Sequence, residues 1–235
     1  MPFSIIEIPI HSKSLATTEK SEHYFASVRT GYLFLALCLS YFVLSWLSNT
    51  MLLTENVYYN TFSEQLSLEQ IKTFTNLQSR YAFLGYGLIF LSLLLKVTYT
   101  AIWLAVAAVL VDWDFSFGDM FKAALVAEVV FLAGAVIQFI WCLLFLEVNV
   151  LADVAGFYPL SLLNFFNAAQ LEPWLVYPLR TFNLFEVAYC FLLIHLLKIR
   201  FQRSSNATAG LVFGGYGVGL FIWVLIAMFI NVLLS

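Results

Sequence analysis

The sequence predicts an all-α protein: a polytopic membrane helix bundle with five transmembrane helices and short amphipathic or interfacial helices. Of the 235 residues, 62% are hydrophobic and only 11% are charged, whereas globular chains carry about 25% charged residues. The apolar residues form long runs, and about 20 such residues in a helix cross a bilayer. A transmembrane barrel would show segments of about ten alternating residues instead. We therefore expect an integral membrane protein whose first partner is the lipid bilayer.

Five runs are long enough to cross the hydrocarbon core, which is about 30 Å thick. Residues 1–30 are more polar and form a separate N-terminal segment, and residues 31–235 form one five-helix transmembrane domain. The expected spans lie at about 31–52, 81–111, 120–147, 180–198 and 208–234.

The lysines and arginines predict the orientation. Seven lie in the N-terminal segment and in the second-to-third and fourth-to-fifth loops, and three lie in the other loops. Basic residues concentrate on the cytoplasmic side of membrane proteins. We therefore expect the N-terminus in the cytoplasm and the C-terminus outside it. Because the basic residues are scattered, nothing indicates nucleic acid as a partner.

A short amphipathic helix is expected just before the second span. Ser67-Leu-Glu-Gln70 has the spacing of a capping box, and Leu66 and Ile71 are placed for a hydrophobic staple. Apolar residues then recur every three or four positions up to Tyr81, which is the period of a helix with one apolar face. We expect this helix over 67–80, continuing into the second span.

Residues 148–179 are apolar but interrupted by Pro159, Pro173 and Pro178. Prolines at this density exclude a continuous span, because proline cannot donate the helical backbone hydrogen bond. Aromatic residues such as Trp174 suit the membrane interface. We expect an interfacial or re-entrant helix near 160–171 on the external side.

The third span has a start signal, Ser116-Phe-Gly-Asp119, because a carboxylate near a helix N-terminus complements the helix dipole. Asp112, Asp114 and Asp119 have a second interpretation as ligands of a divalent cation. Three carboxylates on a tight turn are more often a cap and a solvated turn, so we predict no metal site.

No catalytic constellation is present in the sequence. HExxH, GxSxG and P-loop motifs are absent, and Cys38, Cys142 and Cys190 lie one in each of three apolar runs. None of these cysteines has a pair spacing suited to zinc or redox chemistry. We therefore predict a non-enzymatic protein without a cofactor.

Lys96 lies near the middle of the second span, about 15 residues from each end. Glu128 and Glu186 are predicted at comparable depth in the third and fourth spans. A charge inside the membrane is less costly when paired, so Lys96 should face the bundle interior and pair with Glu128 or Glu186. Asn183 and Tyr189 share the face of Glu186 and are candidates for completing its hydrogen bonds. The alternatives to a structural pair are an ion or proton pathway, or a snorkelling Lys96 on a bent span.

The fifth span opens with AGLVFGGYGVG and contains two small-xxx-small pairs, Gly210 with Gly214 and Gly215 with Gly219. Glycines on one face let helix backbones approach closely. This face is predicted to pack within the chain or, alternatively, to form a partner or dimer interface.

Two stretches resemble the Yip family of five-span Ypt/Rab-interacting membrane proteins. FSFGDMFKAALVAEVVFLAGAVIQ (115–138) is similar to the turn and third helix of bacterial members. The stretch at 179–221 is similar to the family's fourth helix, short polar turn and fifth helix. The resemblance implies five spans, a cytoplasmic N-terminus and a location in the bacterial inner membrane.

Three function classes are compatible with these features. The first is a non-enzymatic scaffold or accessory subunit that acts through helix packing and binding of a membrane-protein partner or of a second copy. The second is an ion or solute transporter or channel component that uses Lys96, Glu128 and Glu186. The third is an intramembrane enzyme, for which no residues indicate a particular reaction.

Overall fold

The chain, described here from a computed structural model, is helical along nearly its whole described length, residues 29–155, 157–166 and 171–234. Within these ranges the only β-type pairing is an isolated bridge between Ser161 and Asn183. The all-α class is therefore confirmed.

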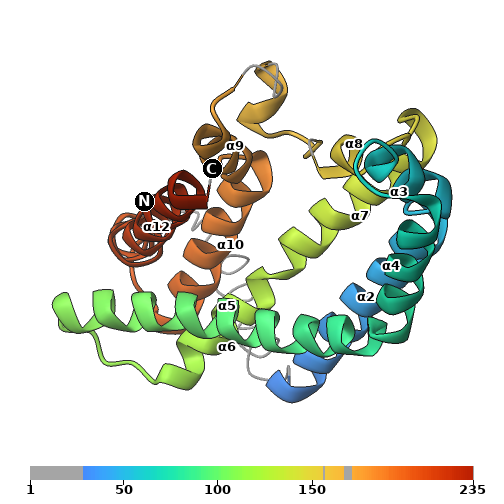
Figure 1. Cartoon of the computed structure of the whole chain (residues 1–235). Helices are drawn as coiled ribbons and strands as arrows, with labels where there is room; N and C mark the ends of the chain where they lie inside the picture. Colours follow the sequence, from blue (N-terminus) through green and yellow to red (C-terminus); the bar gives the residue numbers. More distant parts are fainter. Residues whose placement is uncertain (1–28, 156, 167–170, 235) are drawn as a thin grey trace, which may run out of the picture.

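The N-terminal segment up to residue 28 lies outside the described residues. The helices (Figure 1) are α2 (Thr30–Met51), α3 (Glu55–Phe62), α4 (Leu68–Arg80), α5 (Ala82–Leu110), α6 (Phe117–Ala127), α7 (Val129–Phe145), α8 (Leu151–Ala155), the 3-10 turn η1 (Leu162–Phe165), α9 (Pro173–Thr181), α10 (Leu184–Phe201), α11 (Ser205–Val212), the π-helical turn η3 (Phe213–Gly217) and α12 (Val218–Leu234).

Four stretches of helix in the described chain are long and apolar enough to cross a membrane. They are Thr30–Met51, Phe83–Leu110, Phe117–Phe145 and Ser205–Leu233, and they match the first, second, third and fifth expected spans. The expected fourth span corresponds to α10, which begins later than predicted and carries charged residues in its first and last turns. Length and composition therefore support four spans, and α10 as a fifth span stays a prediction.

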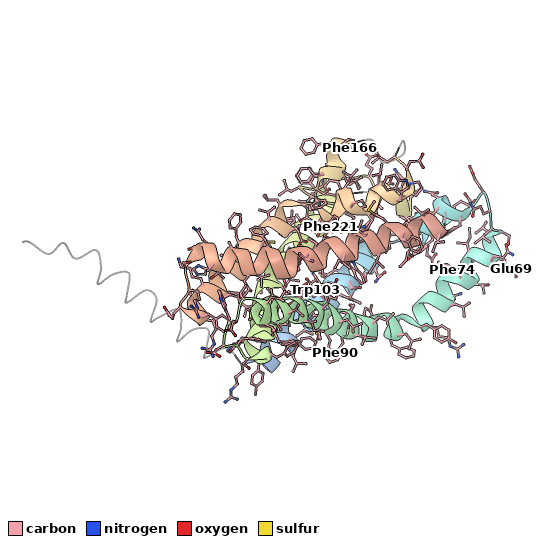
Figure 2. The ribbon with its side chains drawn as sticks, turned by 90° about the vertical axis from the view of Figure 1, so that its left-hand side faces the viewer. Glu69, Phe74, Phe90, Trp103, Phe166 and Phe221 are labelled. Carbon is pink, nitrogen blue, oxygen red and sulfur yellow. The ribbon has the colours of Figure 1, made fainter. Side chains whose placement is uncertain are left out.

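The capping box before the second span is confirmed. The Ser67 backbone N–H donates to Gln70 Oε1 at 2.9 Å, and the Gln70 N–H donates to Ser67 Oγ at 3.3 Å. Each side chain thus satisfies a backbone donor that the first helical turn leaves free. The structure ends α4 at Arg80 and starts α5 at Ala82. Figure 2 shows α4, marked by Glu69 and Phe74, bending away from the line of α5.

The helix expected near 160–171 is wrong in position. The structure has only the four-residue turn η1 there, and the helix α9 follows from Pro173; residues 167–170 lie outside the described residues. Leu160 has a left-handed backbone with φ of 57°. The Leu162 N–H then donates to Phe182 O at 3.0 Å, and the Leu184 N–H donates to Leu160 O at 3.1 Å. This extended pairing takes the place of helical hydrogen bonds, and Pro173 starts α9 because proline is favoured at a first helical position.

The core lies where α5, α6 and α10 meet the start of the last span. Its buried residues are mostly small on α5 and α6 and large on α10, and the small residues let the helices approach closely. Figure 1 shows α9, α10 and α12 on one side of the molecule, α2 and α7 on the other, and α5 passing along both groups. The central buried residues are Ala101, Leu104, Ala108, Met120, Ala123, Leu193, Leu197 and Val212.

The bundle has two chemically different ends. The turn before α6 and the turn after α10 lie together at one end, where Arg200 Nε is 2.9 Å from Asp119 Oδ1. We call this the basic end. The segments between α2 and α5 and between α7 and α10 lie at the opposite end, which we call the loop end. Asp119 of α6 therefore forms an ion pair with Arg200 of α10.

The two glycine pairs differ in what they contact. A Cβ built on Gly215 would lie 2.7 Å from the backbone oxygen of Trp103, and one on Gly219 would lie 2.5 Å from Trp103 Cδ1. The Tyr99 hydroxyl also donates to Gly219 O at 2.8 Å. Gly215 and Gly219 therefore let the last span press against α5 within the chain. A Cβ on Gly210 or Gly214 would meet nothing within 4 Å in the described chain, so an interface role for that pair stays a prediction.

We predict that Gly219→Ala lowers the melting temperature of the protein in nonionic detergent, because the added methyl group overlaps the Trp103 ring. Overpacking of this kind costs about 1–3 kcal/mol. Gly210→Ala is the matched control: it adds the same methyl group into open space and should not lower the melting temperature. Equal losses for both variants would contradict the close approach of the last span to α5.

Candidate functional site

Lys96 pairs with Glu128, one of the two acids predicted for it. Lys96 Nζ lies 2.7 Å from Glu128 Oε1. The Glu128 side chain is 2% exposed, whereas the Lys96 side chain is 44% exposed. The carboxylate is thus enclosed in the bundle, and the ammonium lies at the edge of this enclosure.

The third span positions Glu128 at the junction of α6 and α7. Its N–H donates to Ala124 O at 3.1 Å, and its own carbonyl accepts from the N–H groups of Phe131 and Leu132 at 3.0 and 3.2 Å. The hydrogen-bond ladder therefore continues through the junction. Ala127 is fully buried beside it. Small residues here let α5 and α6 approach, which brings the two charged side chains together.

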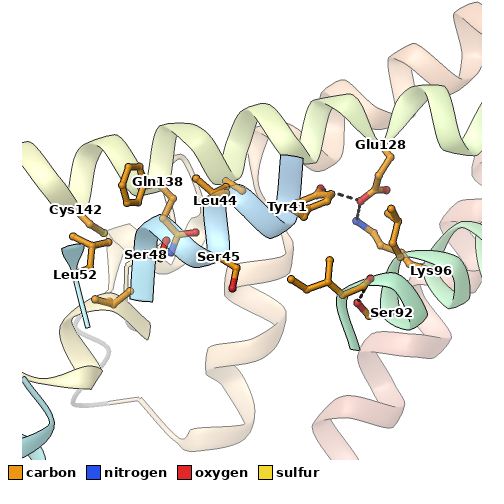
Figure 3. A pocket seen from close by; sticks show the side chains of 15 residues that line it. Tyr41, Leu44, Ser45, Ser48, Leu52, Ser92, Lys96, Glu128, Gln138 and Cys142 are labelled. Atoms are coloured by element: carbon orange, nitrogen blue, oxygen red, sulfur yellow. Dashed lines mark hydrogen bonds and ion pairs between the residues drawn. The ribbon is translucent and has the colours of Figure 1, made fainter. Parts of the chain in front are cut away.

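Two aromatic residues complete the surroundings of the pair. The Tyr41 hydroxyl, from α2, donates to Glu128 Oε1 at 3.3 Å, and Lys96 Nζ lies 3.5 Å from the centre of the Phe131 ring. Contact with an aromatic face stabilises an ammonium. Figure 3 shows Tyr41 and Lys96 converging on Glu128 from two different helices. Glu128 Oε2 is buried and has no hydrogen-bond partner in the described chain.

Glu186 lies in a separate cluster. It is buried at the first turn of α10 and accepts a hydrogen bond from the Tyr216 hydroxyl of η3. Of the two residues expected to complete its hydrogen bonds, only Asn183 bonds Glu186, and not at the carboxylate. Asn183 Oδ1 instead accepts from the Glu186 backbone N–H at 2.9 Å as the cap of α10, and the Tyr189 hydroxyl donates to Ala124 O at 3.4 Å.

An aromatic layer joins the two clusters. The Tyr189 ring lies 4.8 Å from the Phe131 ring and 5.0 Å from the Tyr216 ring, measured between centroids. Tyr189 is fully enclosed between them. The five residues predicted as one cluster thus form two polar clusters with packed rings between them.

A cavity of about 520 Å³ leads from the loop end to the ion pair. It lies between α2, α5 and α7, and Val154 of α8 lies at its far end. Figure 3 shows Ser45, Ser48 and Gln138 along its length. The other lining residues, on α2, α5 and α7 or directly next to them, are Tyr41, Leu44, Ser45, Ser48, Leu52, Ile89, Ser92, Leu93, Lys96, Glu128, Ala135, Gln138, Phe139 and Cys142. Lys96 lines this cavity and is therefore accessible to a molecule that occupies it.

The loop after α8 is fixed to the cavity wall. Gln138 Nε2 donates to Phe157 O at 2.7 Å. Next to it, the Tyr158 carbonyl accepts from Ser161 Oγ and Asn164 Nδ2, each at 2.9 Å. Burial raises the pKa of the Tyr158 hydroxyl, although the nearby Arg180 guanidinium acts in the opposite direction. Tyr158 therefore stays neutral at physiological pH.

The acidic turn does not gather a metal site in the structure. In residues 29–155, 157–166 and 171–234, no group of three His, Cys, Asp or Glu side chains could hold a metal ion. Asp119 pairs with Arg200, and Asp112 occupies a left-handed turn position with φ of 53°. The three cysteines, Cys38, Cys142 and Cys190, are free thiols.

The chain matches no family model, and no curated protein or solved structure is significantly similar to it. The resemblance to the Yip family therefore stays a prediction, and the function must be argued from the geometry.

We predict that Lys96→Met destabilises the folded protein by about 3 kcal/mol, because it leaves the enclosed Glu128 carboxylate without its cation. The double variant Lys96→Met/Glu128→Gln should regain most of this loss, because no unpaired charge remains. Thermal unfolding of the purified proteins in the same detergent measures both effects. A double variant that is less stable than Lys96→Met would show that the two residues are not coupled.

The hydroxyl groups of Tyr216 and Tyr41 should contribute differently to the stability of the folded protein. Tyr216→Phe leaves a buried oxygen of Glu186 without its donor and should cost about 2 kcal/mol. Tyr41→Phe should cost less than about 1 kcal/mol, because Glu128 keeps Lys96 and the lost bond is long. Thermal unfolding of the two variants side by side checks this order, which a larger loss for Tyr41→Phe would overturn.

Proposed function

We propose that this integral membrane protein is a non-enzymatic scaffold or accessory subunit of Yip-like fold. In this proposal α10 is the fifth span, and the protein lies in a bacterial inner membrane with its N-terminus in the cytoplasm and its C-terminus outside. The positions of the basic residues and the resemblance described above support this orientation and location.

The outer face of α2 carries the proposal. Leu37 is the only buried residue of this 22-residue helix. The exposed side repeats large side chains with spacings of three and four, which is the pattern of helix–helix seams; its members are Tyr32, Leu35, Leu39, Phe42 and Trp46. Phe42 also packs against Tyr86 of α5, with ring centroids 4.5 Å apart. The other members of the stripe are open to a partner helix or to a second copy of the chain.

The buried polar groups support the same proposal. Lys96 and Glu128 join α5 to the α6–α7 junction, and Tyr216 joins η3 to α10 through Glu186. Such contacts fix the register of helices in a bundle, which is a structural role. The spans are thus joined by polar contacts, and α2 lies at the edge of the bundle.

Photo-crosslinking in native membranes tests the proposal. Benzoylphenylalanine in place of Leu39, which is 62% exposed, should form a discrete adduct with a protein that also co-purifies at a stoichiometric level. The matched control replaces Phe221, which is 60% exposed on α12, and should give adducts with lipid only. Lipid adducts alone from both positions would contradict a partner on α2.

A second candidate is an ion or solute transporter or channel component that uses Lys96, Glu128 and Glu186. One observation favours it: the cavity reaches an ion pair near the middle of the spans. Flux measured in proteoliposomes distinguishes the two candidates. If the protein transports, the folded double variant Lys96→Met/Glu128→Gln should lose flux. If it is a scaffold, neither the wild type nor the double variant should show flux above that of empty vesicles.

A further inference from the structure

The cavity between α2, α5 and α7 is large enough for an organic ligand. Its volume of about 520 Å³ lies within the range of about 300–1,000 Å³ typical of ligand sites. The Lys96–Glu128 pair lies at its inner end. We infer that the cavity binds an amphipathic carboxylate, with the carboxylate at Lys96 and the apolar chain pointing toward the loop end. This inference concerns binding alone and does not rest on the proposed function.

The inner end of the cavity selects the charge of the ligand. An ammonium has three N–H donors. One of those on Lys96 is directed to Glu128 Oε1, and the ring of Phe131 covers another side of the group. The Lys96 side chain nevertheless stays 44% exposed, while Glu128 is enclosed. A ligand that reaches this point meets the cation before the carboxylate, so its polar group should be an anion.

The walls select an elongated ligand with an apolar body. The lining of α2 runs from Tyr41 to Leu52, a length of about 16 Å at 1.5 Å per residue. Leu44, Leu93 and Phe139 form apolar wall along this length. An inorganic anion would contact only the inner end and would leave these side chains uncovered. An alkyl chain covers them and gains the free energy of apolar burial.

A few polar groups interrupt the wall. Ser48 and Gln138 lie among the apolar lining residues, and Gln138 already donates to Phe157 O. A small number of polar groups on an otherwise apolar lining is typical of sites that orient a ligand. Ser48 lies about seven residues along α2 from Tyr41, which places it beside the ligand chain and away from its charged group.

Protection of an engineered thiol tests the inference. Ser48→Cys is introduced into a background in which Cys38, Cys142 and Cys190 are replaced by alanine. The protein is reconstituted in phosphatidylcholine nanodiscs, and the rate of modification by a membrane-impermeant thiol reagent is measured. The probes are dodecanoate, dodecanol and dodecyltrimethylammonium, which share one chain and differ in charge.

Dodecanoate should slow the modification about fivefold at a concentration near four times its Kd, as expected for one protecting site. Dodecanol should protect less, and dodecyltrimethylammonium should not protect. In the Lys96→Met/Glu128→Gln background dodecanoate should protect no better than dodecanol. A thiol at Thr73 on the exposed surface of α4, away from the cavity, is the control and should not be protected by any probe.

Three results would overturn the inference. Equal protection by all three long-chain probes would show partition into an apolar groove without recognition of charge. Slow modification in phosphatidylglycerol nanodiscs without any added probe would show that a bilayer phospholipid fills the cavity. Absence of protection by dodecanoate would also reject the site, provided that the unliganded thiol reacts.

Discussion

The ion pair between Lys96 and Glu128 is the contact on which the arrangement of the spans depends. An isolated charge inside a membrane is costly, and here each charge removes the cost of the other at a distance of 2.7 Å. The pair holds α5 against the junction of α6 and α7, and Tyr41 adds α2 to the same point. Three of the four long apolar stretches therefore meet at one carboxylate.

The rest of the bundle is arranged around this point by side-chain size. Small residues on α5 and α6 let these helices approach, and Gly215 and Gly219 do the same for the last span against Trp103. Toward the loop end the lining of α2, α5 and α7 leaves space that becomes the cavity. The pair thus lies between a packed core and an accessible pocket. Lys96 can therefore both pair with Glu128 and bind the carboxylate of the inferred ligand.

The sequence predicted the parts of this arrangement that depend on local chemistry. The apolar runs predicted α2 and α5, and Ser67 with Gln70 predicted the start of α4. Depth in the spans predicted that Lys96 pairs with Glu128 or Glu186, and did not decide between the two. The roles of Tyr41 and Tyr216 could not be predicted, because they depend on the rotation of each helix about its axis. In spans that are apolar on every side, the hydrophobic pattern does not determine this rotation. The helix predicted near 160–171 does not form as expected, because the backbone of Leu160 and Leu162 pairs with Phe182 and Leu184 and this pairing overrides the local preference for helix.

The most direct test of this account is the charge of Glu128 in the folded protein. An infrared difference spectrum between the wild type and Glu128→Gln, recorded at neutral pH in nanodiscs, isolates the absorption of this side chain. The account predicts the loss of an ionised carboxylate band. The loss of a protonated carboxylic acid band would contradict it, because Lys96 would then lie beside a neutral group and the spans would be held by packing alone.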